Sequence, residues 1–196
     1  EMQALIALLN RHFIFNLAIS INRFILKNQP GDASDDLRNY SRLIRMVLNN
    51  SKKTFITLED ELGMLRLYLD MERLRFKNSF DYSISFTNSI DIDNVFVPPL
   101  LLQPFVENSI WHGLMHKEGH GKLEIVLSIK SKILTCIITD NGIGRSKAAM
   151  LKSKSAEKQK SLGLHITTER LALVNKDFDE QTCFNFEDIT DDEGNP

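Results

Sequence analysis

The chain lacks the features that mark several large classes of protein. Its formal net charge is −2 at pH 7, which argues against a nucleic-acid binder that neutralises phosphates with a broad cationic face. No apolar run reaches the roughly 18 residues of a membrane-spanning helix. The longest apolar runs cover residues 4–9 and 95–102, and Pro98 and Pro99 interrupt the second. We therefore expect no nucleic-acid partner and no membrane span within this sequence.

Cysteine is also scarce. Cys136 and Cys183 lie in apolar stretches without CxxC or metal-binding spacing, which favours reduced, cytosolic thiols and leaves a disulfide between them open. The chain begins at Glu1, without an initiator methionine or a signal peptide, and runs directly into a helical pattern. We expect it to be a fragment of a longer protein.

The N-terminal part has the pattern of two helices. Residues 2–27 have two apolar flanks separated by a polar stripe that contains His12 and Asn16. Pro30 and Gly31 then break the pattern, and Ser34 is placed to cap a second helix. Its predicted apolar face consists of Leu37, Tyr40, Ile44, Val47 and Leu48. We expect residues 1–53 to form a helical hairpin that pairs with a second copy, giving a homodimer with a four-helix bundle.

The remaining residues, 54–196, mix helices and strands. A third helix is predicted from Thr57 to about Phe76, with leucines at positions 58, 62, 65 and 69 on one side. Strands are predicted at 80–86, 123–129, 133–139 and 182–186. Further helices are predicted at 97–114, after the two prolines, and at 163–174. The predicted class is α+β: a helical hairpin followed by an α/β sandwich.

Two short motifs could carry chemistry. The segment ENSIWHG, residues 107–113, places Glu107 and Asn108 together in an otherwise apolar helix, where polar side chains are costly to bury without partners. An exposed helix end with Gly113 as its C-cap is an equal alternative. The segment DNGIG, residues 140–144, follows a predicted strand, and its glycines allow a ligand close to the backbone. An ordinary turn is the alternative for this second motif.

Residues 145–160 are strongly basic. Six lysines and arginines stand against the single acid Glu157. A solvated loop is the usual explanation for such a run. Its position between two glycine-containing motifs favours a mobile lid that attracts a polyphosphate, with the helix that begins at Gly163 offering backbone N–H groups to phosphate oxygens.

Three histidines suggest a competing kind of site. His112, His116 and His120 are spaced four residues apart, and the first two could share a helix face and bind a transition metal. Gly113 and Gly119 disturb that geometry, so a metal site is the less favoured interpretation.

The order of motifs resembles a known family. ENSIWHG, then DNGIG, then SLGLHITTERL at 161–171 are similar to the N box and glycine boxes of the Bergerat-fold ATP-binding domain, which gyrases, heat-shock chaperones, histidine kinases and mismatch-repair proteins share. Upstream, HFIFN at 12–16 and SIN at 20–22 resemble the phosphoacceptor segment of LytS-like sensor histidine kinases. The resemblance covers nearly the whole chain.

The resemblance assigns roles to individual residues. Asp140 would accept a hydrogen bond from the adenine amino group, and Asn108 would offer its amide oxygen to Mg²⁺. The resemblance also places residues at the bound ATP, namely His112, Gly142, Gly144, Gly163 and Leu164. His12 would accept the γ-phosphoryl group through a neutral ring nitrogen, which a histidine pKa of about 6.5 makes available. Glu107 would accept a proton or orient His12.

The resemblance also implies partners and a location. The phosphoryl group would pass from His12 to an aspartate in the receiver domain of a response regulator. The chain would be a cytoplasmic domain whose full-length protein is anchored in the inner membrane by an upstream segment, and a closing C-terminal strand would follow Pro196. Two other hypotheses stay open: a Bergerat-fold ATPase in which His12 is inert, and a dimeric signalling module with a degenerate ATP pocket.

Overall fold

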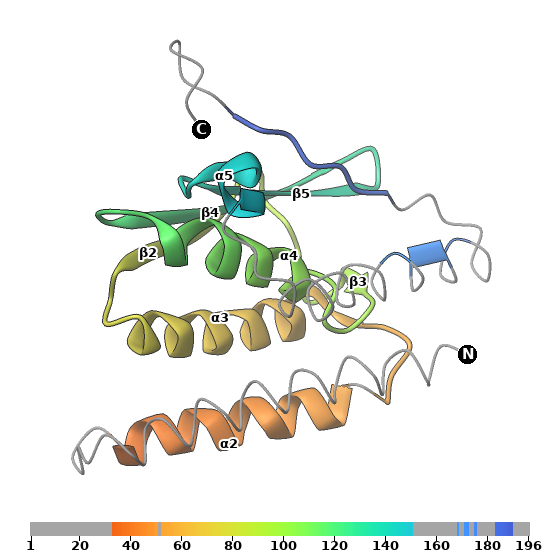
Figure 1. Cartoon of the computed structure of the whole chain (residues 1–196). Coiled ribbons are helices and arrows are strands. Elements are labelled where there is room, and N and C mark those ends of the chain that lie inside the picture. Colours follow the sequence, from red (N-terminus) through yellow and green to blue (C-terminus); the bar gives the residue numbers. More distant parts are fainter. Residues whose placement is uncertain are drawn as a thin grey trace. The chain divides into compact units, whose positions relative to one another are not determined.

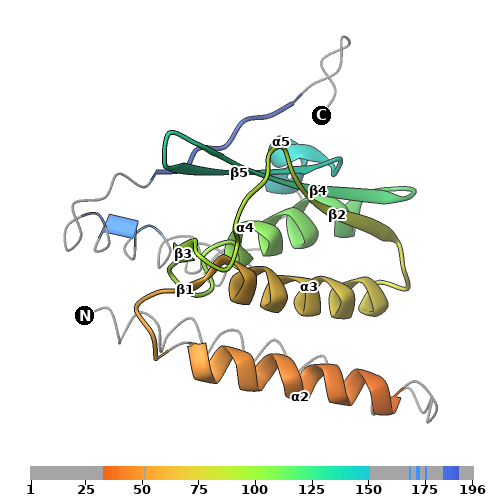
Figure 2. The same ribbon diagram turned by 180° about the vertical axis from the view of Figure 1, so that it is seen from behind.

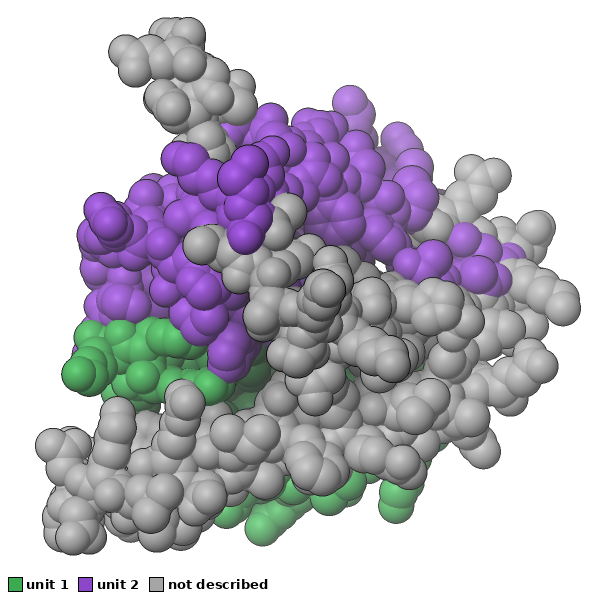
Figure 3. Space-filling model, in the orientation of Figure 1, with its two compact units in different colours: residues 1–77, 91–102 green, residues 78–90, 103–196 purple. Residues whose placement is uncertain are grey.

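A computed structural model of the chain describes residues 33–50, 52–150 and 183–189, together with 168, 171, 172 and 175. The fold is mixed α+β, as predicted. The chain divides into two compact units, one formed by residues 1–77 and 91–102 and the other by 78–90 and 103–196 (Figure 3). The functional boundary predicted between residues 53 and 54 stays a prediction.

Two helices dominate the first unit. Helix α2, Ala33–Asn50, and helix α3, Leu58–Arg75, lie side by side (Figures 1 and 2). The hydroxyl of Thr57 caps α3 by accepting the backbone N–H of Asp60 at 3.1 Å. All four leucines predicted along α3 are buried, so the predicted start and inner face of this helix are confirmed.

The inner face of α2 differs in part from its prediction. Tyr40 and Val47 are buried as expected, and Leu43 is fully buried between them. Leu48, which was also placed on the apolar face, is 44% exposed. Spacings of three and four residues keep side chains on one helix face, so the stripe 40, 43, 47 is continuous and Leu48 lies beside it.

A buried carboxylate shapes the turn after the prolines. Strand β3, Phe96–Val97, pairs antiparallel with β1, Ile56–Thr57. Beyond β3 the chain turns at Leu100, whose φ is 58°. Glu61, on α3, is 2% exposed and accepts the backbone N–H groups of Leu100 at 2.7 Å and Leu102 at 2.9 Å. These bonds satisfy two buried donors that are outside regular structure.

The second unit contains a three-stranded sheet in the order β2-β4-β5. Strand β2, Phe80–Phe86, is parallel to β4, Gly121–Lys130, and β4 is antiparallel to β5, Ile133–Asp140 (Figure 1). All three predicted strands are confirmed. Ser131 and Lys132 have φ values of 51° and 68°, the left-handed geometry of a two-residue hairpin turn.

The helix predicted at 97–114 is shorter and changes form. Helix α4 begins only at Gln103 and ends at Asn108, because Pro98, Pro99 and the left-handed Leu100 exclude helix before it. The chain continues as a π-helix, η1, Ser109–Gly113, and a 3₁₀ turn, η2, Leu114–His116. The inward residues Val106, Ile110 and Leu114 are buried, so the apolar face continues through the change of helix type.

The C-terminal predictions have different outcomes. The strand predicted at 182–186 is wrong for residues 183–186, which have no strand pairing, because Phe184 and Phe186 contact Phe105 instead. The predicted helices at 2–27 and 163–174 lie outside the described residues, apart from 168, 171 and 172, which are helical. In the described part of the chain, no helix combines the length and the apolar character needed to cross a membrane.

Candidate functional site

The two motifs singled out in the sequence meet in space. Gly113, the last residue of η1, lies against the loop that follows β5. A Cβ atom on Gly113 would lie 2.5 Å from Oδ1 of Asp140, and one on Gly142 would overlap the backbone of Gly113. The N–H of Ile143 donates to the carbonyl of Gly113 at 3.3 Å. Only glycine at both positions permits this backbone contact.

Asp140 is held at the end of β5 by the loop that follows it. Its Oδ1 accepts the backbone N–H of Gly142 at 3.0 Å. Asn141 is fixed to the start of β4, since its N–H donates to the Lys122 carbonyl at 3.1 Å and its Oδ1 accepts the Lys122 N–H at 2.7 Å. Among the residues that the structure describes, no side-chain hydrogen bond is found for the second oxygen of Asp140, Oδ2.

Gly144 ends the loop and begins a helix. Its φ is 75°, a conformation that other residues adopt at a cost. Helix α5, Gly144–Met150, starts here and contacts η1. Residues 145–150 of the predicted lid are therefore helical, and residues 151–160 lie outside the described residues.

Glu107 and Asn108 are on the last turn of α4, and both are half-buried. Oε1 of Glu107 accepts Nε2 of Gln103 at 2.8 Å, one helical turn earlier. Asn108 makes no side-chain capping bond to η1. Its amide oxygen is a hard ligand of the type that Mg²⁺ prefers. His112 lies in η1 and is also half-buried. π-Helical turns are frequent at functional sites.

The structure brings together part of the predicted site. Gly142, Asp140 and Gly144 form one loop against Gly113, and Glu107, Asn108 and His112 lie on the helical segment that ends at Gly113. The other predicted site residues, His12, Gly163 and Leu164, lie outside the described residues. Their roles stay predictions.

Sequence reasoning missed a C-terminal contact beside this loop. Arg145, the residue after Gly144, donates to Asp188 through Nε at 2.8 Å and Nη2 at 2.9 Å. This pairing raises the pKa of Arg145 and lowers the pKa of Asp188, mainly through the hydrogen bonds themselves. On α4, the ring of Phe105 lies 5.0 Å from that of Phe184, edge to face. Residues 183–189 thus contact α5, which follows the loop, and α4.

The histidine trio does not form a metal site. His120 pairs with Asp81 at 2.9 Å and His116 is exposed. Among the residues that the structure describes, no group of three or more histidine, cysteine, aspartate or glutamate side chains could hold a metal. Cys136 and Cys183 are free thiols.

Comparison with known proteins identifies the family. The histidine kinase family model matches residues 1–80. The sensor histidine kinase/phosphatase LytS of Staphylococcus aureus strain MRSA252 is 31% identical over 176 residues, which cover 88% of this chain and 30% of that protein. The chain belongs to the LytS-like sensor histidine kinases.

A second relative supports the same family. The sensor protein LytS of Staphylococcus epidermidis strain ATCC 35984 is 31% identical over 144 residues, which cover 74% of this chain and 24% of that protein. The chain thus spans less than a third of the length of these LytS relatives. The ENSIWHG and DNGIG motifs lie beyond the residues matched by the family model.

Proposed function

We propose that this LytS-like chain binds Mg-ATP with a Bergerat-type domain, phosphorylates itself on His12 and passes the phosphoryl group to an aspartate of a response regulator. The observation that carries the proposal is the contact between Gly113, at the end of ENSIWHG, and the Asp140–Gly142 turn of DNGIG. Two motifs that are separate in sequence form one loop-and-helix surface, which is what a shared ligand requires.

The chemistry of each side chain suits its role. The Gly142 N–H holds Oδ1 of Asp140, which fixes the carboxylate so that Oδ2 can select an adenine amino group. Because Gly142 has no side chain, its turn packs directly against the backbone of Gly113, which supports the position of Asp140. The Asn108 amide oxygen and the ATP phosphates suit Mg²⁺, which neutralises phosphate charge when bound.

The transfer step is a displacement at the γ-phosphorus. A ring nitrogen of His12 bonds to phosphorus while the bond to the β,γ-bridging oxygen breaks, and ADP leaves with that electron pair. The ring proton then passes to a base. Glu107, oriented by its 2.8 Å hydrogen bond from Gln103, is the candidate base. Alignment and charge stabilisation supply most of the catalysis in phosphoryl transfer.

We further propose that the chain works as a homodimer through its N-terminal helices, and that the full-length protein is anchored in the inner membrane with this part in the cytoplasm. The relatives that carry the name LytS are sensor proteins, which supports an upstream sensing segment.

Incubation of the chain with γ-labelled ATP and Mg²⁺ tests the function. Label that is labile in acid, stable in alkali and lost in His12→Ala supports the kinase. Release of free phosphate without protein label supports an ATPase instead. Failure to bind nucleotide supports a degenerate signalling module and overturns the proposal.

A further inference from the structure

Asn141 uses its side chain to complete the sheet where β5 ends. Asp140 pairs in register with Leu123, so the next pair along the ladder is Asn141 and Lys122. The Asn141 N–H donates to the Lys122 carbonyl at 3.1 Å, as a regular antiparallel ladder requires. The Lys122 N–H, which the same ladder would pair with the Asn141 carbonyl, instead donates to Asn141 Oδ1 at 2.7 Å. Because the side chain replaces a backbone acceptor, the chain can turn away after Asp140 while β4 keeps its hydrogen bond.

The turn that begins at Asn141 holds the Asp140 carboxylate. The next residue, Gly142, is buried and donates its N–H to Oδ1 of Asp140 at 3.0 Å. The backbone of Gly113 limits the turn on its other side, since a Cβ atom on Gly142 would overlap it. Asn141 itself is exposed, so its side chain directs the turn rather than filling space. A shift of Asn141 would move the Gly142 N–H, and the Asp140 carboxylate would move with it.

A carboxylate that is held in place distinguishes adenine from guanine. Adenine presents an amino group, which is a donor, at the ring position where guanine presents a carbonyl oxygen, which is an acceptor. An ionised carboxylate only accepts hydrogen bonds, so Asp140 would bond to adenine and repel guanine. This discrimination requires the carboxylate to keep its position, because a mobile carboxylate loses the bond to adenine and moves away from guanine.

We infer that Asn141 is a positioning residue that sets the preference of the site for adenine over guanine nucleotides. The inference rests on the proposed ATP-binding function and names a residue that controls its selectivity. The bond from the Lys122 N–H to Asn141 Oδ1 carries it, because this bond anchors the turn between Asp140 and Gly142 to β4. Asn141 acts through Asp140 and does not need to contact the nucleotide.

Calorimetric titration of the full chain with ATP and with GTP, in Mg²⁺ buffer, tests the inference. Asn141→Ala removes the acceptor for the Lys122 N–H. Its Kd for ATP should rise about tenfold, the size of one hydrogen bond to a charged group, whereas its Kd for GTP should rise by less than about twofold. Asn141→Asp keeps an Oδ acceptor and should restore the ratio of the two Kd values. The charge that it adds acts on both triphosphates alike, so the ratio remains the measure of selectivity.

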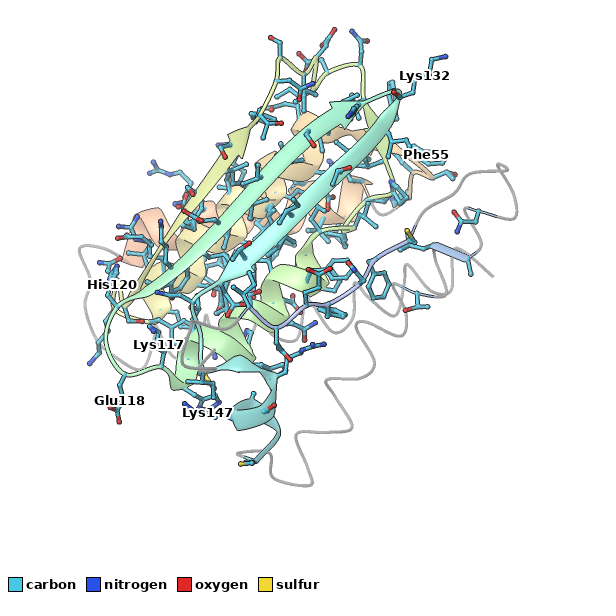
Figure 4. All side chains as sticks on the ribbon, turned by 90° about the horizontal axis from the view of Figure 1, so that it is seen from above. Phe55, Lys117, Glu118, His120, Lys132 and Lys147 are labelled. Atoms are coloured by element: carbon cyan, nitrogen blue, oxygen red, sulfur yellow. The ribbon has the colours of Figure 1, made fainter. Side chains whose placement is uncertain are left out.

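Asn88→Ala is the matched control. Asn88 makes the same pair of bonds near the other end of β4, since its Nδ2 donates to the Ile129 carbonyl at 2.8 Å and its Oδ1 accepts the Ile129 N–H at 3.2 Å. Ile129 is near the turn at Lys132, which lies at the opposite end of the sheet from His120, the residue before β4 (Figure 4). Both asparagines are exposed. Asn88→Ala should therefore lower the stability in urea unfolding about as much as Asn141→Ala and leave the Kd ratio unchanged.

Amide hydrogen exchange gives a second measurement that needs no nucleotide. The Gly142 N–H should exchange faster in Asn141→Ala but not in Asn88→Ala, because only the first change releases the turn. An unchanged Kd ratio in Asn141→Ala overturns the inference, as does an equal loss of ATP and GTP binding or an equal change of the ratio in Asn88→Ala. If the unmodified chain binds neither nucleotide, the proposed function fails and the inference fails with it. If the unmodified chain binds ATP and GTP equally well, only the inference is overturned.

Discussion

Gly142 and Gly113 are in backbone contact, so close that a Cβ atom on Gly142 would overlap the Cα of Gly113 and lie 2.7 Å from Oδ1 of Asp140. Gly142→Ala should therefore lower the free energy of unfolding by about 1–3 kcal/mol, as overpacking does. It should also abolish ATP binding, because Asp140 must move. Chemical unfolding and calorimetry measure the two effects.

Gly63→Ala is the control for that substitution. A Cβ at Gly63, within α3, would meet Met46 Cε at 3.6 Å, an ordinary contact, so alanine should stabilise the helix by about 0.5–1 kcal/mol. If Gly142→Ala binds ATP normally, the contact between the two motifs has no role in the site.

Glu107→Gln tests the candidate base. It keeps the hydrogen-bonding shape of the side chain and removes its basicity, so the rate of His12 labelling should fall by at least about a hundredfold while the Kd for ATP changes little. Glu124→Gln, a carboxylate on β4 that pairs with Lys122, should label at the normal rate. Normal labelling in Glu107→Gln would refute the role of Glu107.

Glu61 stabilises the turn before α4 through its two backbone hydrogen bonds. In Glu61→Gln, one of the two acceptors becomes an N–H₂ group that faces a buried N–H. The free energy of unfolding should fall by about 1–3 kcal/mol. Glu59→Gln, on the same helix with its carboxylate 3.9 Å from Arg66, should change it by less than about 1 kcal/mol. Equal effects in urea unfolding would show that the Glu61 bonds contribute little.

Glu72 should give the stability a pH dependence. Burial raises its pKa above the usual 4.5, and Arg75, 3.3 Å away, partly opposes this. A carboxyl group with a raised pKa binds more protons in the folded chain, so its contribution to the free energy of unfolding falls as pH rises from 4.5 through its folded-state pKa. The stability of Glu72→Gln relative to the unmodified chain should therefore increase over that window. A constant difference in urea unfolding at several pH values would contradict this.

The Arg145–Asp188 pair should hold residues 183–189 in place. Asp188→Asn removes the charge and one acceptor, so amide hydrogen exchange at 184–188 should become faster. Because the hydrogen bonds from Arg145 lower the pKa of Asp188 below 3.8, the tether should persist above that pH and weaken as pH falls through the lowered value. Glu187→Gln is the control, because Glu187 accepts its hydrogen bond from Asn185, two residues earlier, at 3.1 Å. Unchanged amide exchange in Asp188→Asn would show that the Arg145–Asp188 pair does not hold residues 183–189 in place.

Local patterns in the sequence predicted much of the second unit. The alternation from Phe80 and the hairpin at Ser131 and Lys132 depend on neighbouring residues alone, and both are confirmed. In the first unit, the predicted start of α3 at Thr57 is equally local and is confirmed. The late start of α4 was missed because it depends on Glu61, which is far away in sequence and holds the turn at Leu100.

In the candidate site, too, some features follow from local sequence and others depend on contacts between residues far apart in the chain. Motif order singled out the ENSIWHG and DNGIG segments, but the contact of Gly113 with Gly142 depends on the tertiary fold. The contact of residues 183–189 with Arg145 and Phe105 had only a short apolar alternation as its signal, and that alternation was interpreted as a strand. Side-chain pairing over long sequence separations leaves no periodic pattern in the chain.

The parallel pairing of β2 with β4 also sets an order of folding. The β4–β5 hairpin closes across two residues. The pairing of β2 with β4 instead closes the much longer loop between Phe86 and Gly121. Closing the longer loop costs more entropy and is slower. Within this sheet, β2 is synthesised before β4 and β5, and we expect it to pair last. Until then Phe80, Tyr82 and Ile84 belong to an unpaired strand, whose free backbone groups could pair with another chain.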